Sequence, residues 1–265
     1  MAATTVRDGI RQALNLGLAA GQLVLPPLLF ARGFDAGTAV VPTVADPNTV
    51  TPAGYAFAVW GVIYIGSAAH AVVQALPSQR RSGLFRAIGW WTAAGYLLCC
   101  LWLVVARIGP VWATVPVILA MLVTLGHALV VVRRWPEALS RTQRLCVAVP
   151  LGIYVGWLSA ATFVNAADVL PAFGFDRFGL SAEQYGLASI IAAAAVALVF
   201  TVRTRGFLPY VATVVWALIA IVVANGGLPP TGPISLAATV ASALIITVSI
   251  VLGRGPRPRS SARAD

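Results

Sequence analysis

The chain contains no lysine and few charged residues of any kind. Charged residues make up 10% of its 265 residues, whereas a soluble domain carries about 25%. All 18 basic residues are arginine, and only 8 residues are acidic, which gives a net charge of +10. Because the arginines stand in short segments between apolar runs and in the tail, where membrane insertion places them, we expect no nucleic-acid partner.

Cysteine and histidine are equally scarce. Cys99, Cys100 and Cys146 all fall inside apolar runs and lack the paired spacing of a zinc site or a disulfide framework, so we expect small apolar fillers. His70 and His127 are expected at similar depth, and two facing imidazoles could ligate a haem iron. Two separate neutral histidines are the favoured interpretation, so no resident metal or cofactor is expected.

Apolar residues, by contrast, make up 59% of the chain and gather in runs long enough to cross a bilayer. They predict an all-α integral membrane protein. The run at 13–30 follows two arginines and could be a signal peptide, but Pro26 and Pro27 interrupt its end, and a good cleavage site is missing. We therefore expect eight transmembrane helices, at 13–30, 54–76, 87–106, 111–132, 145–167, 185–202, 207–224 and 234–252.

The arginines predict the orientation. With both termini in the cytoplasm, only Arg32, Arg107 and Arg177 of the 18 fall outside, as the positive-inside rule requires. A multi-pass protein of the cell membrane is the expectation, with a cytoplasmic N-terminus at 1–12 and a disordered basic tail at 253–265. The longer outer loops are expected at 31–53, which could cap a cavity, and at 168–184.

Two of the expected helices carry an aromatic stripe on one side. At 100° per residue, each stripe occupies an arc of roughly 80°. For the second helix, packing or interfacial aromatics are the favoured interpretation. The fifth-helix stripe suits an apolar pocket with a few polar groups, and an interhelical hydrogen bond from the asparagine is equally open. The stripes consist of Phe57, Trp60, Tyr64 and Ser67 in the second helix, and of Tyr154, Trp157, Ala161, Asn165 and Asp168 in the fifth.

Glycines lie beside both stripes. Gly61 and Gly66 would let a neighbouring helix approach the second helix closely. Gly152 and Gly156 form a small-xxx-small surface on the fifth helix, at a different angle from its aromatic stripe.

These two helices also carry a family resemblance. The proline at 52, the aromatic stretch and Trp60-Gly61-Val62-Ile63-Tyr64 resemble the second helix of the translocator protein or tryptophan-rich sensory protein (TspO) family. The fifth-helix segment with Tyr154, Trp157, Ala161, Thr162 and Asn165 is similar to that family's Tyr-x-x-Trp and Ala-Thr-x-x-Asn motif. The resemblance covers residues 13–167 as a five-helix core, with 185–252 as a three-helix extension that these motifs do not reach.

The resemblance implies a cavity between the helices that binds porphyrins, other haem-related tetrapyrroles or, in some members, sterols. Carried over to this chain, Trp60, Tyr64, Tyr154 and Trp157 would line the cavity, with Phe57 and Ala161 beside them, and Asn165 would be a polar group at the rim. The chain departs from the family's pattern at Ala58, where a proline is usual, and in the third helix, where Cys99 is nearest to the usual asparagine.

We therefore expect a non-catalytic membrane protein that binds a flat hydrophobic molecule, tetrapyrrole-like first, for sensing, sequestration or transport. A membrane terpenoid cyclase is the alternative; it would need a buried acid, for which only Asp168 or Asp46 is near. A secondary transporter comes third, although no broken-helix repeat is visible. A homodimer is left open.

Overall fold

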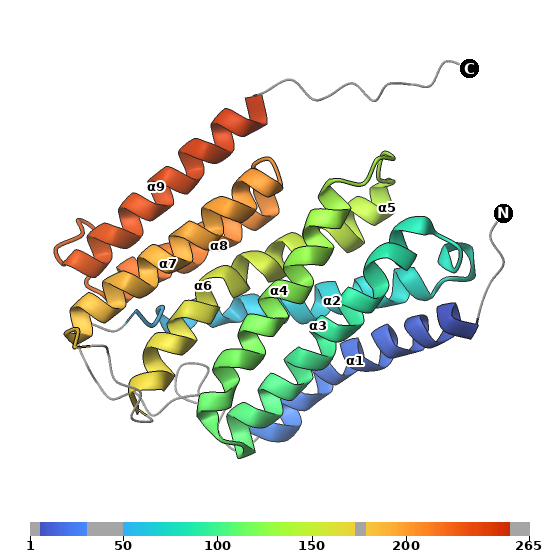
Figure 1. The fold of residues 1–265 in the computed structure, drawn as a ribbon, viewed down its shortest axis with the longest axis horizontal. Helices are drawn as coiled ribbons and strands as arrows, with labels where there is room; N and C mark the ends of the chain where they lie inside the picture. The colour runs from blue at the N-terminus through green and yellow to red at the C-terminus, as the bar shows by residue number, and fades with distance from the viewer. Residues whose placement is uncertain (1–5, 31–49, 173–178, 255–265) are drawn as a thin grey trace.

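The computed structural model describes residues 6–30, 50–172 and 179–254, and these residues form helices joined by short turns (Figure 1). The expected all-α membrane fold is confirmed. The main helices are α1 (Val6–Phe30), α2 (Val59–Ala75), α3 (Gly83–Ile108), α4 (Thr114–Arg133), α6 (Val149–Ala172), α7 (Ala182–Arg203), α8 (Leu208–Ala224) and α9 (Pro233–Arg254).

Shorter helical segments lead into three of these helices or follow one. They are η1 (Gly54–Ala58) before α2, η2 (Pro77–Gln79) after it, η3 (Val111–Ala113) before α4, and α5 (Arg141–Gln143) with the π-helical η4 (Arg144–Ala148) before α6. Seven helical stretches in the described ranges are long and apolar enough to cross a membrane. The 17 residues of α8 are at the short end of the range for a span.

The first helix begins at Val6, seven residues before the start expected from hydropathy. Asp8, Arg11, Gln12 and Asn15 lower the hydropathy of this segment, yet all four side chains are buried. They are buried against α2 and α3, which supply their hydrogen-bond partners. A polar segment can therefore continue an apolar helix when neighbouring helices satisfy it.

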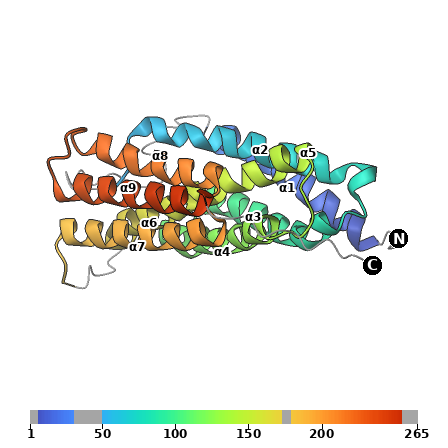
Figure 2. The same ribbon diagram turned by 90° about the horizontal axis from the view of Figure 1, so that it is seen from above.

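Five helices close into a ring. Helix α1 packs on α2 and α3, α3 packs on α4, α4 packs on α6, and α6 returns to α2. The other three helices lie on the far side of α6, where α7 and α8 contact α6 and α9 covers α7 and α8 (Figures 1 and 2). Helix α6 is therefore shared by both groups of helices.

Two glycines explain how α8 approaches α6 so closely. A Cβ added at Gly156 would lie 2.6 Å from the carbonyl oxygen of Tyr210, and one added at Gly152 would lie 2.7 Å from the ring of Phe207. On α2, a Cβ added at Gly66 would lie 2.9 Å from the Pro150 Cβ, but one added at Gly61 would have no atom within 4 Å. Three of the four expected close approaches are therefore present, and the one at Gly61 is not.

The basic residues gather at one end of the helices. The N-terminal end of α1 and the C-terminal end of α9 are directed to the same side (Figures 1 and 2). Arg107 ends α3 at the opposite side. Arg32 and Arg177 lie outside the described residues. The capping role expected for 31–53 and the disorder expected for the tail also concern segments that are mainly outside them.

Candidate functional site

The two aromatic stripes meet inside the five-helix ring, where the ring of Trp60 contacts rings from both stripes. Its ring stacks on Tyr64 with a centroid distance of 5.5 Å and meets Tyr154 and Trp157 edge to face, each at 6.1 Å. Phe57 lies edge to face with Trp157 at 5.6 Å. The aromatic side chains that the sequence motifs indicate lie on η1, α2 and α6, and they form one aromatic cluster.

A third helix contributes a ring that the sequence motifs do not indicate. Trp102 of α3 stacks on Trp60 with a centroid distance of 5.9 Å and an interplanar angle of 24°. No pattern within α3 distinguishes Trp102 from the other tryptophans of the chain. Its role depends on the ring closure that brings α3 opposite α2.

The cluster is only partly buried. Trp102, Tyr154 and Trp157 are buried, whereas Phe57 and Trp60 are partly exposed. Ring pairs at 4.5–7 Å are in direct contact, so Trp60 and Trp157 leave no space for a ligand between them in this conformation. The hollow that the sequence predicts between these two rings is filled by the rings themselves.

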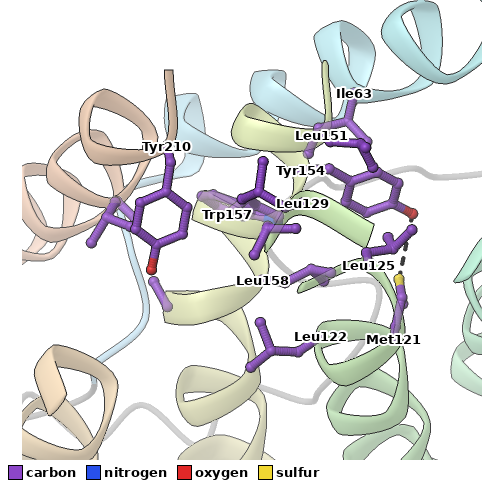
Figure 3. Close-up of a cluster of buried hydrophobic side chains, with 14 of the residues drawn as sticks. Ile63, Met121, Leu122, Leu125, Leu129, Leu151, Tyr154, Trp157, Leu158 and Tyr210 are labelled. Carbon is purple, nitrogen blue, oxygen red and sulfur yellow. Dashed lines mark hydrogen bonds between the residues drawn. The ribbon is translucent and has the colours of Figure 1, made fainter. Parts of the chain in front are cut away.

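Through Tyr154, the cluster continues to α4. The Tyr154 hydroxyl donates a 3.4 Å hydrogen bond to the Met121 sulfur, and Figure 3 shows Tyr154 pointing toward α4. Tyr210 of α8 lies across α6 from Met121 in the same view and shares a 2.9 Å hydrogen bond with the Ser159 hydroxyl. Helix α6 is therefore tied to α4 on one face and to α8 on another.

Several buried polar atoms inside the five-helix ring have no hydrogen-bond partner among the described residues. The indole N–H groups of Trp102 and Trp157 are two of them, and both amide atoms of Gln22 are also unpaired. An indole N–H can only donate, and an unpaired buried donor costs about 1–3 kcal/mol. Such donors fit a site that is completed by an acceptor from water or from a ligand.

The polar residues of the α6 stripe lie apart from the contacts between aromatic rings. Asn165 is buried and its Oδ1 has no partner in the described part of the chain, whereas Ala161 is half-buried against the core. Asp168 is partly buried and accepts a 2.7 Å hydrogen bond from the Thr51 hydroxyl. Asp46, the other candidate acid, lies outside the described residues.

The two histidines are not brought together. His70 is buried, and its Nδ1 lies 2.9 Å from the Tyr96 hydroxyl. His127 is exposed and lies against Trp91, with ring centroids 4.3 Å apart. Because one imidazole is inside the ring and the other on its surface, this arrangement does not form a two-histidine haem site.

A separate apolar crevice lies between α6, α7 and α8, and its cavity volume is only about 10 Å³. Phe163 of α6, Ile190 of α7 and Leu218 of α8 contribute to its walls. Ligand pockets have volumes of about 300–1,000 Å³, so this crevice is small for a tetrapyrrole. The aromatic cluster remains the stronger candidate site.

The family comparison reaches beyond the two motif helices. The family model described as TSPO-like protein matches residues 35–252, which include the three helices after the five-helix ring. No curated protein and no solved structure matches the chain. The apolar helices and this match identify a multi-pass membrane protein, and the chain belongs to the TSPO-like family.

Proposed function

We propose that this protein binds a flat hydrophobic ligand at the aromatic cluster, with a porphyrin-like tetrapyrrole as the first candidate. The observation that carries the proposal is the contact of the partly exposed Trp60 ring with Trp102 and Trp157 from two other helices. The role that follows is sensing, sequestration or passage of the ligand across the cell membrane, without chemistry on it.

The cluster has the two features that such a ligand needs. Stacked and edge-to-face rings offer a planar molecule large apolar contact areas. The indole N–H groups of Trp102 and Trp157, which have no partner among the described residues, offer donors to a carbonyl, a carboxylate or a bridging water. Entry requires the Trp60 side chain to move away from Trp157, because the two rings are in contact.

The arginine-rich end of the molecule is too far away to hold a ligand carboxylate at this site. Trp60 stands in the first turn of α2, and the basic end begins after Ala75, about 22 Å farther along the helix. Arg107 is better placed, since it follows Trp102 by five residues on α3 and is exposed. Its Nε donates to the Leu29 carbonyl oxygen, so the guanidinium already lies against α1.

A titration with protoporphyrin tests the proposal. The purified protein, Trp60→Ala and Trp157→Ala are titrated in detergent while tryptophan emission is followed. We expect each variant to bind at least about tenfold more weakly, a loss of ~1.4 kcal/mol. Trp90→Ala is the matched control, since Trp90 is 37% exposed near the other end of α3, and it is expected to bind like the wild type. Equal affinity of wild type and both cluster variants would refute the site.

A further inference from the structure

The start of α2 carries Phe57 and Trp60 but has little local support. Neither η1 nor α2 has a side-chain hydrogen bond that caps its N-terminus. Unpaired N–H groups at a helix start need a partner from elsewhere, or the first turn frays. Contacts from another part of the chain therefore add to the local backbone hydrogen bonds that hold this segment.

Helix α8 supplies that support. The Ala53 N–H donates a 3.0 Å hydrogen bond to the carbonyl oxygen of Ala220. The indole N–H of Trp216 donates a 3.3 Å hydrogen bond to the carbonyl oxygen of Ala56. The ring of Trp216 also meets the Tyr55 ring edge to face, with centroids 5.2 Å apart. Trp216 and Ala220 are four residues apart and hence on one face of α8.

The same helix holds the other half of the cluster. Helix α6, which carries Tyr154 and Trp157, lies against α8 at Gly152 and Gly156. The Ser159 hydroxyl and the Tyr210 hydroxyl are 2.9 Å apart. Helix α8 therefore contacts both the segment that carries Phe57 and Trp60 and the helix that carries Tyr154 and Trp157.

We propose that α8 is a positioning element of the binding site and that Trp216 is its positioning residue. This inference rests on the proposed function, since it assigns α8, one of the three helices after the five-helix ring, a part in ligand binding. Trp216 does not belong to the cluster of stacked rings. It acts through Ala56 and Tyr55 on the segment that presents Phe57 and Trp60.

Hydrogen exchange of the purified full-length protein tests the inference without any ligand. The variants are Trp216→Phe, which keeps a ring and removes the N–H donor, and Trp216→Leu, which also removes the contact with Tyr55. We expect amide exchange at residues 53–58 to be about fivefold faster in Trp216→Phe, as the loss of one hydrogen bond of ~1 kcal/mol implies, and faster still in Trp216→Leu. Exchange in the middle of α3 is expected to stay unchanged, which separates a local effect from general unfolding.

Protoporphyrin affinity is then measured for the same variants, with Trp112→Phe as the control because Trp112 is similarly exposed, at 44% against 42% for Trp216. Affinity is expected to fall about fivefold in Trp216→Phe and to be unchanged in the control. Unchanged exchange at 53–58 in both Trp216 variants would overturn the positioning role. Faster exchange in a protein whose wild type binds no porphyrin would instead refute the proposed function and leave the support of α2 by α8 standing.

Discussion

Arg11 is the residue whose surroundings the apolar pattern of the chain anticipates least. Only 1% of it is exposed. Its Nη1 donates to the Gln74 Oε1 at 3.1 Å and to the Phe85 carbonyl oxygen at 3.0 Å, and its Nη2 lies 3.6 Å from Asp8. Gly89 leaves room for its side chain, since a Cβ there would lie 2.5 Å from the Arg11 Cδ. This arginine joins α1 to α2 and α3 as well as contributing to the charge at the basic end.

Replacing Arg11 by alanine is expected to lower the free energy of unfolding by about 3 kcal/mol, because two buried acceptors lose their donor at a cost of ~1–3 kcal/mol and a large side-chain volume is left empty. Thermal unfolding in detergent measures the effect. Arg7→Ala is the control: Arg7 is exposed and lies 5.6 Å from the Trp90 ring centroid, a contact of ~0.5–1 kcal/mol. Equal shifts of the melting temperature in both variants would contradict a role for Arg11 in helix docking.

Between elements, the contact of α6 with α8 depends on the absence of a side chain at Gly156. A Cβ added there would lie 2.6 Å from the backbone oxygen of Tyr210 and 2.9 Å from the Thr213 Cβ, closer than van der Waals contact. Backbone atoms cannot rotate aside, so a larger residue must move one of the two helices.

A matched pair of substitutions tests this contact. Gly156→Ala is expected to destabilise the protein by about 1–3 kcal/mol, the usual cost of overpacking. Gly61→Ala is expected to be neutral or to stabilise by up to ~1 kcal/mol, because nothing lies within 4 Å of that position and alanine favours helix. Both are measured by thermal unfolding in the same detergent. A protein that tolerates Gly156→Ala as well as Gly61→Ala would show that α6 and α8 can separate without cost.

For the whole molecule, the helices and the arginines together predict the topology. Eight alternating passes place the start of α1 and the end of α9 on one side, and arginines gather at this side in the turns after α2, α4 and α7. Because basic loops stay in the cytoplasm, we expect both termini to lie there.

Reporter fusions in a bacterial host check this topology. Green fluorescent protein fused after Arg254 is expected to fluoresce, and alkaline phosphatase at the same place is expected to be inactive. The opposite pattern is expected for fusions at Gly109, between α3 and α4, because that turn lies on the other side. Active phosphatase after Arg254 would mean an odd number of crossings or an inverted protein.

The sequence by itself determined the membrane class, the number of helices and most of their limits, because hydropathy and charge are properties of contiguous segments. It also determined which faces of α2 and α6 bear the aromatic rings, since helical periodicity fixes the angle between residues a few positions apart. The start of α1 escaped this reasoning, since Asp8, Arg11 and Gln12 are polar enough to suggest a solvent-facing N-terminus until α2 and α3 are in place.

Tertiary structure alone decided which residues meet. Trp216 and the Ala56 carbonyl oxygen are 160 positions apart in the chain, and no local pattern couples them. The same holds for Trp102, which joins Trp60 only because five helices close into a ring. Helices in lipid choose their neighbours by close packing and buried hydrogen bonds, and these depend on side chains from distant segments that come into contact only in the folded bundle.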